Sequence, residues 1–239
     1  MKKRVLAAFL SMAMVAGLAT GCGTPGSGKS DGDSADGKVF RYATNTLPTT
    51  LDPTKGQSIG DNEIQHAVTE GLTRNTAGDV KPGIAESWDE SEDGLTYTFH
   101  LRKDAKWSDG EPITAADFEY SWKRAASPET AADYSYMFNG IAGYPDNLDV
   151  TASEDGKTLT VVLSAPCAYF LDLAAFPTFY AVKQETVESA EGYLGDDGSV
   201  QNPGAWALEA GFVSSGAYTL TEWKHNESMV YTKNPYYWD

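Results

Sequence analysis

The alternation of apolar and polar positions along the chain predicts several strands. The segment Leu95–Leu101 carries apolar residues at its odd positions, which is typical of a strand with one buried face. Thr158–Leu163 has a similar β-forming pattern, and Lys38–Thr44 predicts a strand near the start of the chain. Near the end, Ala217–Trp223 and Met229–Lys233 flank a polar turn, so we expect them to pair as a hairpin.

Other segments follow a helical spacing. Apolar residues recur every three or four positions in Asp61–Leu72, and shorter helices are expected over Ala168–Ala175 and Gln184–Leu194. Thr114 and Asp117 have the spacing of a capping box, which predicts that a helix begins there. Strands and helices do not alternate strictly. We therefore expect an α/β architecture with mixed sheets and not a doubly wound parallel sheet.

The first residues form a separate pattern. Three basic residues precede an apolar run, Val5–Ala19, which is shorter than the roughly 20 residues of a membrane-spanning helix. Thr20 and Gly21 then precede Cys22, in a sequence that resembles a bacterial lipobox. We expect a lipoprotein signal peptide over residues 1–21 and lipidation of Cys22, with a plain secretory signal as the alternative.

Residues 22–37 are almost entirely Gly, Ser, Asp, Thr and Pro, a composition typical of a flexible tether. A lipid on Cys22 followed by such a tether would hold a folded domain near a membrane. We therefore expect a lipid-anchored protein on the extracytoplasmic face of the cell membrane.

Composition narrows the classes of partner. The formal net charge of −16 gives a surface that repels phosphates, so we expect no nucleic-acid partner. Two cysteines are too few for a disulfide-stapled scaffold. Cys167 lies in an apolar stretch, which predicts a buried free thiol, although a bonding partner after residue 239 is an open alternative.

Chemistry-bearing motifs are missing from the sequence. His66, His100 and His225 are widely separated and do not form a zinc-binding helix motif. The sequence has no nucleophile elbow, phosphate loop or dinucleotide fingerprint. We therefore predict that the protein is not an enzyme and holds neither a metal nor a cofactor.

An ordered set of motifs carries a family resemblance that runs from about Val39 to Asp239. The motifs, in chain order, are Leu51-Asp52-Pro53, Pro82-Gly83-Ile84-Ala85-Glu86-Ser87-Trp88, Tyr97-Thr98-Phe99-His100-Leu101-Arg102, Ala105-Lys106-Trp107-Ser108-Asp109-Gly110-Glu111-Pro112, Ser215-Gly216-Ala217-Tyr218 and Lys233-Asn234-Pro235-Tyr236-Tyr237-Trp238. Together they resemble the oligopeptide- and dipeptide-binding proteins of ABC importers.

The resemblance implies a periplasmic-binding-protein-like fold of type II. Residues 38–239 would form the first lobe with an inserted subdomain at about 55–180, and the second lobe would be missing. It implies a monomer that captures extracellular oligopeptides between two lobes and delivers them to a membrane permease and its ATPase. The alternative within the family is a non-peptide ligand, such as a nickel chelate, haem, a sugar or an opine.

The resemblance also implies which residues contact the ligand. A peptide would lie extended along the loop Asn45-Thr46-Leu47-Pro48-Thr49, bonded through its backbone like an added strand. Pro48 has no N–H donor, which removes one such bond. Tyr134 would stack on a ligand side chain, with Tyr136 beside it. The alternatives are a plain connecting loop and an aromatic cluster that packs the subdomain. Ligand length and side-chain preference stay open.

Overall fold

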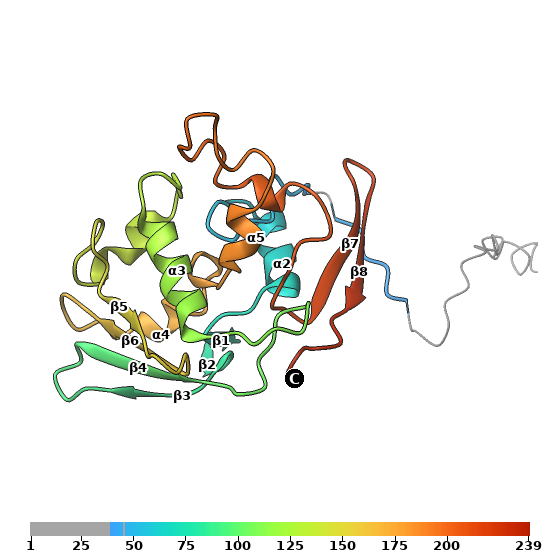
Figure 1. Ribbon diagram of the computed structural model, residues 1–239. Helices are drawn as coiled ribbons and strands as arrows, with labels where there is room; N and C mark the ends of the chain where they lie inside the picture. The colour runs from blue at the N-terminus through green and yellow to red at the C-terminus, as the bar shows by residue number, and fades with distance from the viewer. Residues whose placement is uncertain (1–38, 45) are drawn as a thin grey trace, which may run out of the picture. The chain divides into compact units, whose positions relative to one another are not determined.

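The structure is a computed structural model that describes residues 39–44 and 46–239 (Figure 1). The expected signal peptide, the whole of the tether with Cys22, and Asn45 lie outside the described residues. The chain divides into two compact units, and every helix and strand below belongs to the unit formed by residues 44–239.

Residues 39–44 form no strand, so the prediction of a first strand is wrong for the part of it that is described. The apolar side chains of Val39, Phe40 and Tyr42 are exposed. A strand requires a neighbour with which to share its backbone hydrogen bonds. Local β-propensity is not sufficient without that partner.

The largest sheet has four antiparallel strands in the order β3 (Ala85–Glu90), β4 (Thr96–Leu101), β6 (Thr158–Val162) and β5 (Val150–Ala152). Figure 1 shows helix α3 (Ala115–Ala126) lying across one face of this sheet. The alternation predicted for β4 is confirmed, because its apolar side chains are buried and the intervening ones are more exposed.

The first core fills the space between α3 and this sheet. Buried rings of Phe99, Phe118, Trp122, Phe138 and Phe170 dominate it. The ring centroids of Trp122 and Phe138 lie 6.0 Å apart in an edge-to-face arrangement, a favourable geometry for aromatic pairs. The short elements that complete this core are η1 (Ser135–Gly140), α4 (Phe170–Leu173) and η2 (Pro177–Phe179).

A second core lies around α2 (Ile59–Val68) and the antiparallel hairpin of β7 (Tyr218–Lys224) and β8 (Ser228–Lys233). It is closed by α5 (Gln184–Glu188) and η3 (Ala205–Ala207). Its buried members are Leu51, Val68, Val182, Val187, Trp206, Ala207 and Leu220. A separate small hairpin is formed by β1 (Thr73–Thr76) and β2 (Asp79–Pro82).

Most predicted elements are confirmed, with shifted ends. Helix α2 covers residues 59–68 and not 61–72, because Ser58 caps it and residues 73–76 turn into strand β1. Helices α4 and α5 are shorter than predicted, and the capping box of α3 and the β7–β8 hairpin are confirmed. The mixed α/β fold without a doubly wound parallel sheet is confirmed as well.

The search for membrane-spanning segments covered the described residues. Among them, no helix combines the length and the apolar character that crossing a bilayer requires.

Candidate ligand-binding site

The described part of the predicted peptide-binding loop is accessible to solvent. Residues 46–50 form neither helix nor strand. Leu47 is 56% exposed and Thr49 is exposed, whereas Thr46 and Pro48 are half-buried. This segment therefore lies at the surface, where an extended ligand can reach it, and the backbone amides of Thr46 and Thr49 already bond Thr44 Oγ1 and Asp61.

One buried carboxylate holds this loop. Asp61, in the first turn of α2, is fully buried. Its Oδ1 accepts a hydrogen bond from the Thr49 backbone amide at 2.8 Å. Its Oδ2 accepts bonds from the backbone amides of Gln57 at 3.1 Å and Ser58 at 2.9 Å. Burial alone would raise the pKa of Asp61, but these backbone N–H groups hold it below its usual range.

A glycine next to Asp61 permits the loop to lie close to the helix. A Cβ atom added to Gly60 would come within 2.9 Å of the Thr46 Cβ and 3.2 Å of the Thr46 carbonyl oxygen. Any side chain at position 60 would therefore push the loop away. Gly60 and Asp61 together place the two ends of the described loop, Thr46 and Thr49, against the first turn of α2.

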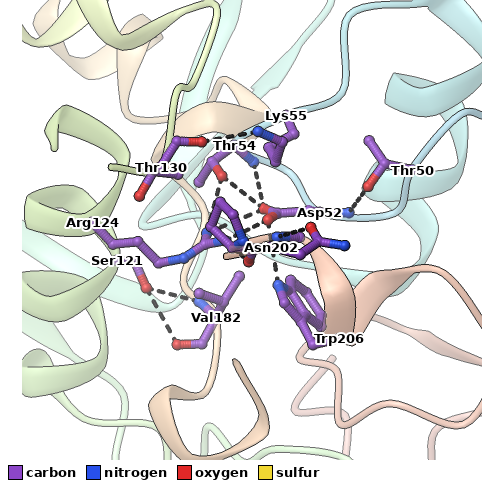
Figure 2. Close-up of polar contacts among 12 residues, drawn as sticks. Thr50, Asp52, Thr54, Lys55, Ser121, Arg124, Thr130, Val182, Asn202 and Trp206 are labelled. Atoms are coloured by element: carbon purple, nitrogen blue, oxygen red, sulfur yellow. Dashed lines mark hydrogen bonds and ion pairs between the residues drawn. The ribbon is translucent and has the colours of Figure 1, made fainter. Parts of the chain in front are cut away.

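The segment that follows the loop is fixed by a buried ion pair, shown at the centre of Figure 2. Asp52, fully buried, accepts hydrogen bonds from both terminal nitrogens of Arg124, which projects from α3. Asp52 also accepts bonds from the Thr54 hydroxyl at 2.8 Å and the Trp206 indole at 3.3 Å. Burial alone would raise the pKa of Asp52, but the charge and hydrogen bonds of Arg124 hold it below its usual range.

The predicted aromatic residues form a cluster at the surface. The ring centroids of Tyr134 and Tyr136 lie 6.2 Å apart, and the ring of Phe176 meets Tyr134 edge-on at 5.5 Å. Tyr136 is 57% exposed, and Tyr134 and Phe176 are half-buried. The cluster therefore packs within itself and also presents aromatic surface to solvent.

Two contacts join the segment after the loop to the residues before this aromatic cluster. The Lys55 ammonium donates a hydrogen bond to the Thr130 carbonyl oxygen at 2.9 Å, also visible in Figure 2. The Gln57 side-chain amide donates to the carboxylate of Asp133, which immediately precedes Tyr134. The residues just before and within the first turn of α2 thus connect the loop, through Asp61, with Asp133 and so with Tyr134.

The remaining candidate groups lie elsewhere. An open pocket of about 520 Å³ lies along α3 and is bounded by Tyr120, Arg124 and Tyr193, so it includes none of the predicted ligand-binding residues. Within residues 39–44 and 46–239, no group of three or more His, Cys, Asp or Glu side chains is placed to hold a metal ion. Cys167 is a free thiol that is half-exposed, which corrects the expectation of a buried one.

Sequence reasoning did not identify several residues that shape this site. The loop is held by Asp61, and Arg124 anchors Asp52. The contact between Gln57 and Asp133 holds the segment that leads into the tyrosines. One signal was present: Ser58 and Asp61 have the same spacing as the capping box found at Thr114 and Asp117. The contacts of Asp61 with Thr49 and of Gln57 with Asp133 cross between segments and have no local signal.

Comparison with known proteins identifies what this arrangement is similar to. The profile of the family described as bacterial extracellular solute-binding proteins, family 5 Middle, matches residues 79–239. The periplasmic oligopeptide-binding protein OppA of Escherichia coli is 40% identical over 202 residues, covering 80% of this chain and 35% of that protein. The probable deoxycholate-binding periplasmic protein YgiS of Escherichia coli is 33% identical, covering 84% of this chain and 38% of that protein.

A solved structure has the same fold. The substrate-binding domain of an oligopeptide ABC transporter from Bacillus anthracis superposes with a TM-score of 0.73 at 36% sequence identity. The match covers 83% of this chain and 38% of that one. The chain thus spans less than half the length of the proteins it matches.

Proposed function

This chain belongs to the bacterial extracellular solute-binding proteins of family 5, and we propose that it forms one wall of a cleft that captures oligopeptides. Relatives of this chain bind peptides for ABC importers. In the proposed mechanism a peptide lies extended along residues 45–49, and backbone hydrogen bonds supply most of the affinity. Residues outside this chain would form the opposite wall.

The observation that carries this proposal is the anchored loop of residues 46–49 at the surface of the protein. Backbone recognition requires N–H and C=O groups that are accessible and held in place, since ordering a flexible loop on binding would cost affinity. Asp61 fixes the Thr49 end and the buried Asp52 fixes the segment that follows. Tyr134 and Tyr136 would then contact ligand side chains, because both retain accessible ring surface.

The delivery pathway is part of the proposal. We propose that residues 1–21 are a signal peptide, that Cys22 carries the lipid, and that residues 22–37 tether the protein to the extracytoplasmic membrane face. The loaded protein, acting as a monomer, would deliver its peptide to an ABC permease and its ATPase. We also propose an inserted subdomain at about 55–180; the buried members of the first core run from Leu72 to Ala181, which supports its end, whereas Val68 belongs to the second core.

A second candidate function is capture of an apolar, non-peptide ligand. It is favoured by the relative named for deoxycholate, which is 33% identical. The rings of Tyr134, Tyr136 and Phe176 offer a surface to which a steroid skeleton could bind as well as a peptide side chain. The anchored surface loop of residues 46–49 favours the peptide, because a steroid has few groups that could bond to its backbone.

Calorimetry of the full-length protein tests these alternatives. We expect a mixed pool of synthetic tri- to pentapeptides to bind, and deoxycholate not to bind. Tyr134→Ala should weaken peptide binding several-fold, and Tyr218→Ala, which removes an exposed tyrosine from β7, is the matched control. Tight binding of deoxycholate or a metal chelate without any peptide binding would overturn the proposal.

A further inference from the structure

We propose that Asp61 and Gly60 are positioning residues, which set the backbone of residues 46–49 in the geometry that a peptide requires without touching the peptide. This inference rests on the proposed function, because it concerns the same loop. The first turn of α2 would thus contribute to ligand affinity in addition to capping the helix.

The hydrogen bonds of Asp61 reach two different segments. One oxygen accepts from Ser58 and Gln57, at and just before the helix N-cap, as in an ordinary capping box. The other accepts from Thr49, twelve residues earlier in the chain. An ionised carboxylate has only acceptor sites, so it can satisfy all three backbone amides at once.

Asparagine cannot reproduce this arrangement. Its single side-chain oxygen would keep the Gln57 and Ser58 amides of the helix cap, which are two donors against one, and its NH₂ group would then face the Thr49 N–H donor. The Asp61→Asn variant therefore retains the size of the side chain and loses one of the two attachments. The loop would then have to be ordered when the peptide binds.

Gly60 supplies an independent test of the same contact. Gly60 lies inside α2, where alanine is a better helix former. The Gly60→Ala side chain would nevertheless meet Thr46 closer than real Cβ atoms come to such neighbours. Gly60→Ala should therefore displace the loop and leave the Asp61 cap in place.

The structure offers a matched control in α3. Asp117 occupies the same capping-box position, and its carboxylate accepts from the Thr114 backbone amide at 2.7 Å and the Thr114 hydroxyl at 3.0 Å. Its carboxylate also accepts a hydrogen bond from the Trp107 side chain, and these partners lie outside residues 46–49. Asp117→Asn therefore perturbs a capping box without perturbing the ligand loop.

The test compares wild type, Asp61→Asn, Gly60→Ala and Asp117→Asn in the full-length protein. Calorimetry measures the affinity for the mixed peptide pool, and hydrogen exchange of the ligand-free protein follows the Thr49 amide. We expect Asp61→Asn and Gly60→Ala to bind about tenfold more weakly, because the loop must be ordered on binding. Asp117→Asn should bind like wild type. Exchange at Thr49 should accelerate in Asp61→Asn alone, since Gly60→Ala displaces the Thr46 end.

Each outcome decides the proposal. If Gly60→Ala and a folded Asp61→Asn bind peptides as tightly as Asp117→Asn does, the positioning role is wrong. If Asp61→Asn does not fold, Gly60→Ala decides the question. If wild type binds no peptide, the proposed function fails, and the exchange rate at Thr49 still decides whether Asp61 holds the loop.

Discussion

The starts of helices α2 and α3 carry the same local motif and serve different purposes. Ser58 and Asp61 cap α2, and Thr114 and Asp117 cap α3, with the same three-residue spacing. The α3 cap takes its further hydrogen bond from the Trp107 side chain. The α2 cap also receives the Thr49 amide from a distant segment. A capping motif thus predicts where a helix begins and leaves open what else its carboxylate binds.

The electrostatics of the two carboxylates differ accordingly. Burial alone would raise the pKa of both carboxylates. At Asp61 the backbone amides outweigh burial and the pKa is lowered, whereas at Asp117 the bonds from Thr114 and Trp107 are insufficient and the pKa is raised. The balance between burial and the hydrogen-bond donors that reach a carboxylate therefore decides the direction of its pKa.

The largest effect should come from the buried ion pair between Asp52, which precedes α2, and Arg124 in α3. Asp52→Asn would leave the Arg124 guanidinium buried without a counter-charge, because that side chain is only 5% exposed. Loss of one partner from a buried pair costs about 3–5 kcal/mol of unfolding free energy. Urea unfolding followed by tryptophan fluorescence measures the loss. A cost below about 1 kcal/mol, the range of exposed pairs, would show that the pair is solvated.

The next largest effects should come from replacing the two capping carboxylates, Asp61 and Asp117, by alanine, and the two losses of unfolding free energy should differ. Asp61→Ala removes the partner of three backbone amides, so we expect a loss of roughly 2–3 kcal/mol. Asp117→Ala should cost about 1 kcal/mol or less, because it removes a cap whose charge is disfavoured by burial. Equal losses of unfolding free energy in the two variants, measured by urea unfolding, would contradict this difference between the two caps.

Acid should act on the two carboxylates in opposite directions. The stabilisation from Asp61 is fully present above its ordinary pKa of 3.8 and is lost as the pH falls through the lower value in the folded protein. The penalty from ionised Asp117 is fully present above its raised pKa and disappears as the pH falls towards 3.8. Unfolding curves between pH 7 and 3, with Asp61→Asn and Asp117→Asn as references, measure both slopes. Slopes of the same sign would contradict this prediction.

The smallest effect should follow from Thr49→Val. This substitution removes a hydroxyl whose distance to Asp61 Oδ2 is 3.4 Å, and it keeps the backbone amide that makes the short bond. We expect a change in unfolding free energy of less than about 0.5 kcal/mol, as for most surface substitutions. A larger loss would mean that the side chain and not the backbone attaches the loop.

Local patterns predicted the elements that have a clear signal of their own. Strand β4 alternates along its length, α3 has a capping box and the last two strands flank a polar turn. Strand β3 had no such signal, since most of its side chains are exposed and its place depends on pairing with β4. The segment 39–44 shows the converse, because it has β-forming residues and no described partner.

The sequence by itself determined the fold class, the family resemblance and the loop and tyrosines proposed to contact the ligand. Only the tertiary structure decided how these parts are held. Asp61 reaches Thr49 across twelve residues, Gln57 reaches Asp133 across 76, and Arg124 reaches Asp52 across 72. The physical reason is that such hydrogen bonds require only that two groups meet in space after folding. Periodicity and capping rules describe neighbours a few positions apart, so they contain no information about such pairs.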